Sequence, residues 1–205
     1  MAPIQANRTG MLLIISGPSG TGKGTLVKKL MENDPSFRFS CSVTTRKPRT
    51  GEIEGVHYYF VTDEEYDRMV ANNEFLEHAT VHGHHYGTLR KPVEDLMAQG
   101  YNVLLDIDPQ GAISVMENAE DYVSVFILPP SFEELRVRLH TRNTDDPVEI
   151  ERRLNNARGE VNKIDRYQYT VVNDNLDLAF AQLQSIVNAE KQRTKRYHPI
   201  IPEKR

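Results

Sequence analysis

Residues 16–25 read Ser16-Gly17-Pro18-Ser19-Gly20-Thr21-Gly22-Lys23-Gly24-Thr25. An apolar run over residues 11–15 precedes this stretch, and a helical pattern over residues 26–30 follows it. The order of strand, glycine-rich loop and helix is the context of a phosphate-binding loop. Glycines let successive backbone N–H groups turn inward, and the positive end of the following helix also attracts an anion. The stretch therefore predicts a site for the phosphates of a nucleotide.

Lys23 adds a mobile positive charge at the end of this loop, close to a phosphate that would be transferred. The next residue is Gly24, where the common motif has Ser or Thr, and the hydroxyl comes one place later at Thr25. This shift leaves open whether Thr25 contacts a magnesium ion or a phosphate. We expect the nucleotide to be bound by the whole loop, namely Gly17, Pro18, Ser19, Gly20, Thr21, Gly22, Lys23, Gly24 and Thr25.

The composition narrows the class of protein. The formal net charge of −4 argues against a sequence-independent nucleic-acid binder, which is usually basic. No apolar run approaches the ~20 residues that a membrane-spanning helix needs, and the first ten residues lack the apolar centre of a signal peptide. The single cysteine, Cys41, excludes an internal disulfide and fits a reducing compartment. We expect a cytoplasmic protein that binds neither nucleic acid nor membrane.

Strand and helix patterns alternate in residues 11–36 and again from residue 89 onward. This alternation predicts the α/β class, with a parallel sheet flanked by helices on both faces. Residues 37–88 break the rhythm and contain a single helix, which begins at Thr62 or Asp63 with a cap and acidic residues. We expect a small β-rich insert here, with one strand over 37–44 and further strands over 56–61, 75–81 and 84–88.

Both ends of the chain are expected to lie outside the folded domain. Residues 1–10 are polar and predict a flexible N-terminal tail. Residues 194–205 are basic, contain two prolines and predict a C-terminal tail that is exposed or disordered. The folded domain would then span residues 11–193.

The insert carries a candidate phosphate clamp. Arg46 and Arg49 lie three residues apart around Pro48, and two guanidinium groups held close on a stiff loop suit a phosphate. Tyr58 and Tyr86 could add hydroxyl donors. The insert therefore predicts a second anion site besides the glycine-rich loop.

Two carboxylates follow a buried strand pattern over residues 101–108. Asp106 and Asp108 are two residues apart, so in an extended strand both side chains would point to one face. Ligands of open α/β sheets bind outside the carboxyl ends of the strands. Both aspartates are therefore candidates for the site, although either of them could also cap the helix that starts at Pro109.

Several segments, taken together, resemble the guanylate kinase family. They occur in the family's order, and the resemblance covers residues 11–193. The segments are residues 42–52 with Gly55 and Tyr58-Tyr59-Phe60, Asn73-Glu74-Phe75-Leu76-Glu77, His85-Tyr86-Gly87-Thr88 and Leu105-Asp106-Ile107-Asp108-Pro109-Gln110-Gly111. The resemblance implies a P-loop NTPase core (11–36, 89–139 and 155–193), a GMP-binding insert (37–88) and a helical lid (140–154).

The resemblance also implies a reaction, in which ATP and GMP give ADP and GDP with magnesium. ATP would bind the glycine-rich loop. GMP would be held by Ser42, Arg46, Arg49, Tyr58, Glu77, Tyr86, Thr88 and Asp108. Lys23, Arg46 and the lid or lid-flanking arginines Arg138, Arg142 and Arg153 would be catalytic. Asp106 would serve magnesium, directly or through water, and Asp108 would serve GMP, although the two roles could be exchanged.

Glu77 is the residue that would select guanine. Guanine offers N1–H and N2–H₂ donors side by side, and one carboxylate can accept from both; adenine lacks the N1–H and would leave Glu77 unpaired. One position departs from the family, because Asn143 follows Arg142 where a glycine is usual. Asn tolerates left-handed backbone angles better than most residues do, so the turn of the lid can be retained.

Other functions compete with an active guanylate kinase. A related binding module could use the Arg–Tyr clamp for phosphopeptides without catalysis, but it would need neither the intact loop with Lys23 nor Arg142. A related kinase could phosphorylate AMP or a sugar phosphate instead. The sequence leaves the oligomeric state as monomer or homodimer.

Overall fold

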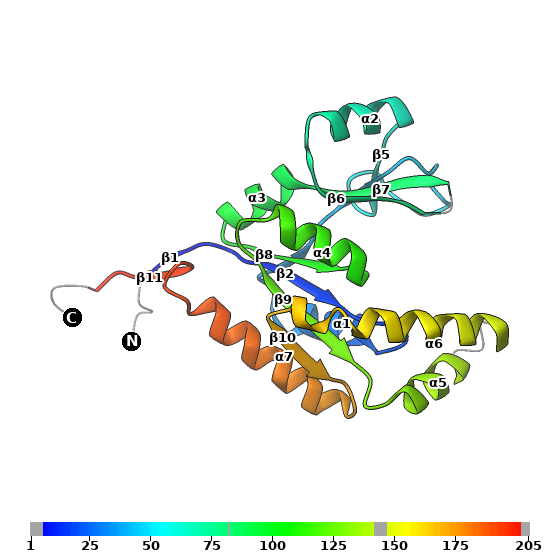
Figure 1. The fold of residues 1–205 in the computed structure, drawn as a ribbon. Coiled ribbons are helices and arrows are strands. Elements are labelled where there is room, and N and C mark those ends of the chain that lie inside the picture. Colours follow the sequence, from blue (N-terminus) through cyan, green and yellow to red (C-terminus); the bar gives the residue numbers. More distant parts are fainter. Residues whose placement is uncertain (1–5, 82, 142–146, 202–205) are drawn as a thin grey trace.

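The computed structural model describes residues 6–81, 83–141 and 147–201. Its core is a five-stranded parallel sheet in the order β10-β9-β2-β8-β3 (Figure 1). The strands are β2 (Leu12–Ser16), β3 (Phe37–Phe39), β8 (Asn102–Asp106), β9 (Val123–Leu128) and β10 (Tyr169–Val172). Because all five run in the same direction, their carboxyl ends meet at one edge of the sheet, where the glycine-rich loop begins.

Helices cover both faces of this sheet, as the α/β prediction required. Leu13 and Ile15 of β2 share a core with α1 (Lys23–Asn33) and α7 (Leu176–Lys191) on one face. On the opposite face, Leu12 and Ile14 pack with α3 (Arg90–Ala98) and α4 (Pro109–Asn118). A strand buried on both faces has no polar alternation, which is why the sequence of β2 is continuously apolar.

The insert is a separate four-stranded sheet in the order β5-β4-β7-β6. It contains β4 (Ser42–Thr44), β5 (Tyr58–Phe60), β6 (Phe75–Val81) and β7 (His84–Leu89). It stands above the core sheet and carries α2 (Asp63–Ala71) on its outer side (Figure 1).

Helix α2 covers one face of the insert sheet. Tyr66 of α2 is buried with Val43 and Phe75, and its ring stacks on the ring of His85 with 4.6 Å between centroids. The helix begins with a complete capping box, in which Thr62 accepts from the Glu65 N–H and Glu65 accepts from the Thr62 N–H.

Two helices, α5 (Phe132–Thr141) and α6 (Pro147–Val161), flank the segment 140–154 that was predicted as a lid, and a 3₁₀ turn at Ile164–Arg166 follows α6. The two helices pack on one another through a small apolar cluster of Leu135, Leu139, Ile150, Leu154 and Ala157. The predicted lid residues Arg142 and Asn143 lie outside the described residues.

The prediction of one strand over residues 37–44 is wrong. Phe37–Phe39 pairs with β8 in the core sheet, whereas Ser42–Thr44 pairs with β5 and β7 in the insert. The chain leaves the core between these strands, so the first three residues assigned to the insert belong to the core sheet. The sequence pattern could not show this, because both pieces are rich in strand-forming residues and differ only in their partners.

The two predicted tails are also corrected, because their described parts pair with each other. β1 (Ala6–Arg8) and β11 (Tyr197–Pro199) form an antiparallel ribbon beside the core (Figure 1). Gly10 is buried, and its N–H donates to the Met97 carbonyl at 2.8 Å. Strands of three residues have little sequence signal, and their pairing depends on residues about 190 positions apart.

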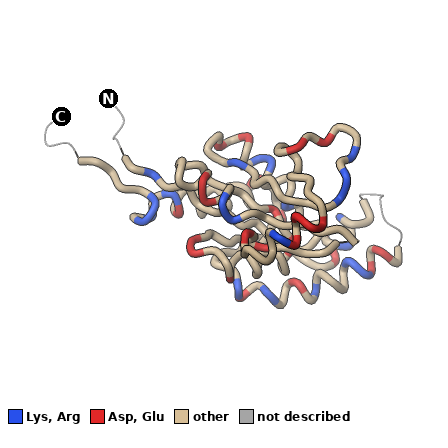
Figure 2. The backbone as a smooth tube through the Cα atoms, turned by 90° about the horizontal axis from the view of Figure 1, so that it is seen from above, with Lys and Arg blue, Asp and Glu red and all other residues tan. Residues whose placement is uncertain are grey.

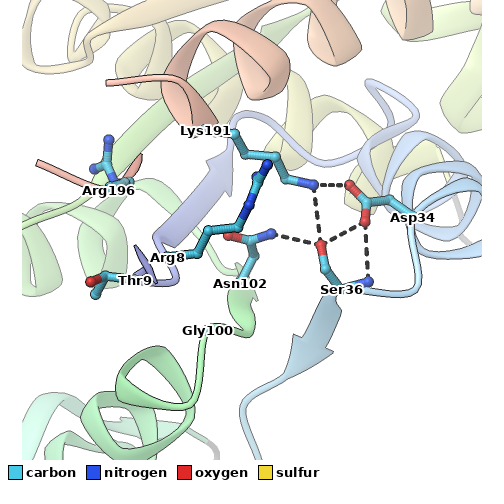
Figure 3. Close-up of a pocket in the computed structure, with 8 residues that line it drawn as sticks. All are labelled: Arg8, Thr9, Asp34, Ser36, Gly100, Asn102, Lys191 and Arg196. Atoms are coloured by element: carbon cyan, nitrogen blue, oxygen red, sulfur yellow. Dashed lines mark hydrogen bonds and ion pairs between the residues drawn. The ribbon is translucent and has the colours of Figure 1, made fainter. Parts of the chain in front are cut away.

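A polar network ties the C-terminal segment to the core (Figure 3). Lys191 forms an ion pair with Asp34 and donates to Ser36 Oγ at 3.1 Å, while Asn102 Nδ2 donates to Ser36 Oγ at 2.8 Å. These groups line a cavity of about 210 Å³ that also includes Arg196. The cavity lies at the seam between the two chain ends and the core, and we assign it a structural role.

Arg196 is the residue that the tail prediction most misjudged. Its side chain is 2% exposed and forms ion pairs with Glu190 at 2.6 Å and with Asp121 at 2.7 Å.

Basic and acidic residues are otherwise interspersed along the chain (Figure 2). Among the described residues, none of the helices combines the length and the hydropathy that crossing a bilayer requires.

Candidate active site

The glycine-rich loop lies between the end of β2 at Ser16 and the start of α1 at Lys23. Gly17 has φ +136°, and a Cβ there would lie 2.2 Å from the Ile127 carbonyl oxygen. Gly22 has φ +87°, and a Cβ there would lie 2.4 Å from Asn173 Nδ2. Gly22 caps α1 without any side-chain hydrogen bond, so the first N–H groups of the helix remain available for an anion.

Lys23 folds back over this loop. Its Nζ donates to the Gly17 carbonyl at 2.5 Å and to the Pro18 carbonyl at 3.1 Å. Burial raises the pKa values of Asp106 and Glu160, and the positive charge of Lys23 opposes both increases. Lys23 therefore contacts the loop carbonyls and also acts electrostatically on the carboxyl groups of Asp106 and Glu160.

A cavity of about 460 Å³ opens beside the loop on the side of α5 and α7. Arg138 lies along it, with Nε donating to Glu134 Oε1 at 2.9 Å and Nη1 donating to the Asn173 carbonyl at 2.8 Å. Asn173 is buried and donates from Nδ2 to the Thr21 carbonyl at 2.8 Å, which links the end of β10 to the loop. The lining residues are Gly20, Gly22, Thr25, Glu134, Val137, Arg138, Thr141, Asn173, Asp174 and Leu176.

The predicted GMP residues of the insert share one face of its sheet. Ser42 pairs with Tyr58, and Glu77 pairs with Thr88. Tyr86 lies two residues before Thr88 on the same strand. Because paired residues and residues two apart project to the same side, these five side chains occupy the face opposite α2.

Arg46 forms the charged centre of that face. Its guanidinium group makes a bidentate pair with Glu52, with Nη2–Oε1 at 2.8 Å and Nη1–Oε2 at 3.0 Å. It also lies 5.4 Å from the centroid of the Tyr58 ring, and the rings of Tyr58 and Tyr86 are 6.1 Å apart. The predicted clamp residues Arg46, Tyr58 and Tyr86 are thus brought together.

Glu52 is a site residue that the sequence reasoning missed. The hydrogen bonds from Arg46 and from the Arg49 backbone N–H, at 2.7 Å, lower the pKa of Glu52 to about 2. Its carboxylate fills the guanidinium fork with the geometry that a phosphate would use. The available signal was an acid three residues after Arg49 in a basic loop. The Arg49 side chain itself is exposed and makes no hydrogen bond within the described residues.

Glu77 and Asp108 meet at the junction of insert and core. The Thr88 hydroxyl donates to Glu77 Oε1 at 2.8 Å. Glu77 Oε2 and Asp108 Oδ2 lie 3.6 and 3.9 Å from the position that a Cβ on Gly111 would occupy, so both face the same small space. Burial raises the pKa of Glu77, the Thr88 hydrogen bond opposes this, and the charge of Asp108 adds to the rise.

Asp108 does not extend the strand as expected. β8 ends at Asp106, and Asp108 caps α4 by accepting from the N–H groups of Gln110 at 2.7 Å and Gly111 at 3.1 Å. The two aspartates consequently face different neighbours. Limited hydration raises the pKa of Asp106 while the charge of Lys23 opposes the rise, and Asp108 faces Glu77.

The lid arginines are only partly described. Arg138 lines the cavity beside the loop, and Arg153 on α6 lies 3.4 Å from Glu149 Oε1 through its Nε. Arg142 falls outside the described residues. Within the described residues, no group of three His, Cys, Asp or Glu side chains could hold a metal ion.

Comparison with known proteins gives a consistent result. A family model described as guanylate kinase matches residues 9–190. A guanylate kinase of Clostridium perfringens is 46% identical over 196 residues, which cover 96% of this chain and 91% of the relative. One from Chelativorans sp. is 50% identical over 190 residues, covering 92% and 87%. A crystal structure of guanylate kinase from Anaplasma phagocytophilum superposes with a TM-score of 0.69 at 39% identity, covering 94% of this chain and 92% of the other.

Proposed function

This chain belongs to the guanylate kinase family and phosphorylates GMP, and we propose that it transfers the phosphoryl group from ATP on the glycine-rich loop to GMP on the open face of the insert. The observation that supports this proposal is that Ser42, Tyr58, Glu77, Tyr86 and Thr88 share one face of the insert sheet. The glycine-rich loop would then bind the phosphates of the donor, ATP, and the arginine–tyrosine clamp of the insert would bind the phosphate of the acceptor, GMP.

ATP binds at residues 17–25 in this proposal. The uncapped start of α1 and the loop N–H groups receive the phosphates, and Lys23 leaves the Gly17 and Pro18 carbonyls to approach the transferred group. The cavity lined by Arg138 and Asn173 receives the rest of the nucleotide. Arg138, Arg142 and Arg153 would offset the charge that develops on the phosphates as the lid closes.

GMP binds across the insert. Arg46 and Arg49, with the hydroxyls of Tyr58 and Tyr86, hold its phosphate. Glu77 accepts from guanine N1–H and N2–H₂, with Ser42, Thr88 and Asp108 around the base. We propose that Glu52 is a positioning residue, which keeps the Arg46 guanidinium group aimed at the acceptor phosphate.

Magnesium fits this donor set. Mg²⁺ retains several waters and usually binds through one or two carboxylates together with substrate phosphates, so it needs no dedicated cluster of protein ligands. Asp106, directly or through water, and Thr25 would hold it next to Lys23. When bound, the ion would neutralise charge on the phosphates of ATP.

We further propose a cytoplasmic enzyme that is a monomer or a homodimer. The free thiol of Cys41 supports a reducing compartment. Native mass spectrometry of the full chain distinguishes the two oligomeric states.

Glu77→Gln tests the acceptor assignment. An amide directs its own donors at those of guanine, so kcat/KM for GMP should fall by about 10²-fold or more, while KM for ATP stays within about twofold. The measurement is coupled ADP production with GMP, dGMP, AMP, CMP and UMP as acceptors.

The pH dependence gives a second readout for the same residue. Because the pKa of Glu77 is raised, protonation should begin to weaken GMP binding at a higher pH than for an ordinary glutamate. KM for GMP should therefore rise as the pH is lowered, and Glu77→Gln should remove that part of the dependence. Glu64→Gln, at an exposed position on α2, is the matched control. Equal GMP kinetics in wild type and Glu77→Gln would refute the assignment.

A further inference from the structure

Asn173, the residue that follows β10, is buried between the core sheet and the phosphate loop. It is 5% exposed, and its backbone N–H donates to the Leu128 carbonyl at 2.8 Å, which fixes it to the end of β9. Its side-chain Nδ2 donates to the Thr21 carbonyl of the loop at 2.8 Å. A buried amide is costly unless it is hydrogen-bonded, so this bond holds the loop and the sheet together.

The same amide lies directly against the backbone of Gly22. A Cβ on Gly22 would meet Asn173 Nδ2 at 2.4 Å, so any larger residue would push the amide away from the loop. The φ of +87° at Gly22 also favours glycine there. Gly22 therefore has a second role besides its backbone angle, since it lets Asn173 reach the Thr21 carbonyl.

The hydrogen bond to the Thr21 carbonyl also sets the direction of an N–H group. The Thr21 carbonyl and the Gly22 N–H belong to one peptide unit, and in a planar trans peptide the two groups point in opposite directions. Because the carbonyl points at Asn173, the Gly22 N–H points away from it. Within the described residues this N–H donates to no other group, so it is available to a phosphate oxygen at the start of α1.

The backbone of Asn173 connects the same site to α5. Arg138 Nη1 donates to the Asn173 carbonyl at 2.8 Å. The loop itself packs on α5 at Gly20, where a Cβ would lie 2.9 Å from the side chains of both Leu135 and Leu139. The loop, the end of β10 and α5 are thus joined around the cavity of about 460 Å³, which Asn173 and Arg138 both line.

We propose that Asn173 is a positioning residue for the donor phosphates: its side-chain amide aims the Gly22 N–H at them, and its backbone carbonyl keeps Arg138 beside them. This role rests on the proposed ATP site and deepens it. Asn173 acts on the phosphates through the loop, so its effect does not depend on the base that the donor carries. A residue that contacted the base would affect only ligands that have one.

The test is Asn173→Ala, with binding of ATP and of inorganic tripolyphosphate, which has no base, measured by titration calorimetry in the presence of Mg²⁺. The substitution leaves the Thr21 carbonyl without its donor, so the Gly22 N–H is no longer held in place. We expect Kd for both ligands to rise by the same factor, about tenfold. KM for ATP should rise with it, while KM for GMP stays within about twofold.

Asn173→Asp is the second variant and keeps the shape of the side chain. An ionised carboxylate cannot donate to the Thr21 carbonyl and repels the phosphates as well, so both dissociation constants should rise further than in Asn173→Ala. Thermal unfolding shows that each variant is folded, and Asn173→Asp carries the same comparison of ligands if Asn173→Ala does not fold.

Asn175→Ala is the matched control. Its amide oxygen caps α7 and accepts from the N–H groups of Asp177 and Leu178, so this variant should lower Tm and keep both dissociation constants. Wild-type binding of both ligands by the Asn173 variants would overturn the proposal, as would weaker binding of ATP alone, which would assign Asn173 to the base. Failure of the proposed function is recognised separately, because the wild-type enzyme would then bind neither ligand and show no turnover with GMP.

Discussion

The pairing of Arg46 with Glu52 illustrates how one residue can hold a binding group ready. A free arginine on a loop samples many rotamers, and each must be restricted when phosphate binds. Glu52 restricts Arg46 in advance through two hydrogen bonds, and its pKa of about 2 keeps the carboxylate charged throughout the neutral range. Phosphate then meets an ordered guanidinium group, and it would bind through the N–H donors that Glu52 does not use.

Glu52→Gln should weaken GMP binding. The amide cannot make the bidentate ionic pair, so Arg46 becomes less ordered, and we expect KM for GMP to rise by about tenfold. KM for ATP should stay unchanged, because the pair lies only on the acceptor side. Initial-rate kinetics with each substrate varied in turn measure both constants, and Glu64→Gln again serves as control. A decrease in KM for GMP would instead mean that Glu52 competes with the substrate for Arg46.

At the level of elements, the described helices begin in two different ways. α2, α4 and α7 start with side-chain caps from Thr62, Asp108 and Asn175. α1, which starts after Gly22, and α3, which starts after Leu89, have no side-chain cap, and of these two only α1 follows the glycine-rich loop. A side-chain oxygen there would occupy the place of a phosphate oxygen, so the missing cap is consistent with ligand binding rather than with stability.

Thr62→Ala tests the structural kind of cap. It removes one half of the capping box of α2, and we expect the free energy of unfolding to fall by about 1 kcal/mol. Urea denaturation measures the loss. Thr50→Ala, at an exposed turn in the same insert, should change the stability by less than about 0.5 kcal/mol. An equal effect of the two substitutions would contradict the capping argument.

At the level of the whole molecule, the chain ends contribute to stability through a buried charge cluster. Arg196 pairs with Glu190 and Asp121, and the side chains of Arg196 and Glu190 are almost fully buried. Burial raises the pKa of Glu190, but the hydrogen bonds from Tyr169 and Arg196 outweigh it, so the net pKa lies below its usual value.

Arg196→Ala should destabilise the protein by about 3–5 kcal/mol, because it leaves Glu190 buried without its cation. Lys195→Ala, at a half-exposed neighbour, should cost less than about 1 kcal/mol. Since the Glu190 pKa is lowered in the folded state, the stabilisation is present above the unfolded value of 4.5 and is lost as the pH falls below it. The difference between wild type and Arg196→Ala in urea denaturation should therefore shrink toward pH 3, and a difference independent of pH would contradict the assignment.

Closure is the second prediction at this scale. Arg46 stands on the insert and Lys23 on the core, and both must approach one phosphorus atom, so the insert and lid should move inward when both nucleotides are bound. Small-angle scattering with a bisubstrate analogue should show a smaller radius of gyration than the free protein. ATP alone should give an intermediate value, and identical curves in all three states would count against closure.

The sequence by itself predicted the features that depend on interactions between residues close together in the chain. The strand, the glycines and Lys23 define the phosphate loop, and periodicity defines the α/β core. Thr62 or Asp63, with the acidic residues that follow, indicates the start of α2. The spacing of Arg46 and Arg49 around Pro48 indicated a phosphate clamp, and the family resemblance then supplied Glu77. Each of these signals lies within a few residues, where backbone angles and hydrogen-bonding capacity act directly.

Only the tertiary structure decided which distant groups meet. It placed Phe37–Phe39 in the core sheet, paired the two chain ends, made Asp108 a helix cap and brought Glu52 to Arg46. The physical reason is that burial, charge pairing and edge-strand pairing belong to the folded chain, so the sequence specifies them only through the whole fold.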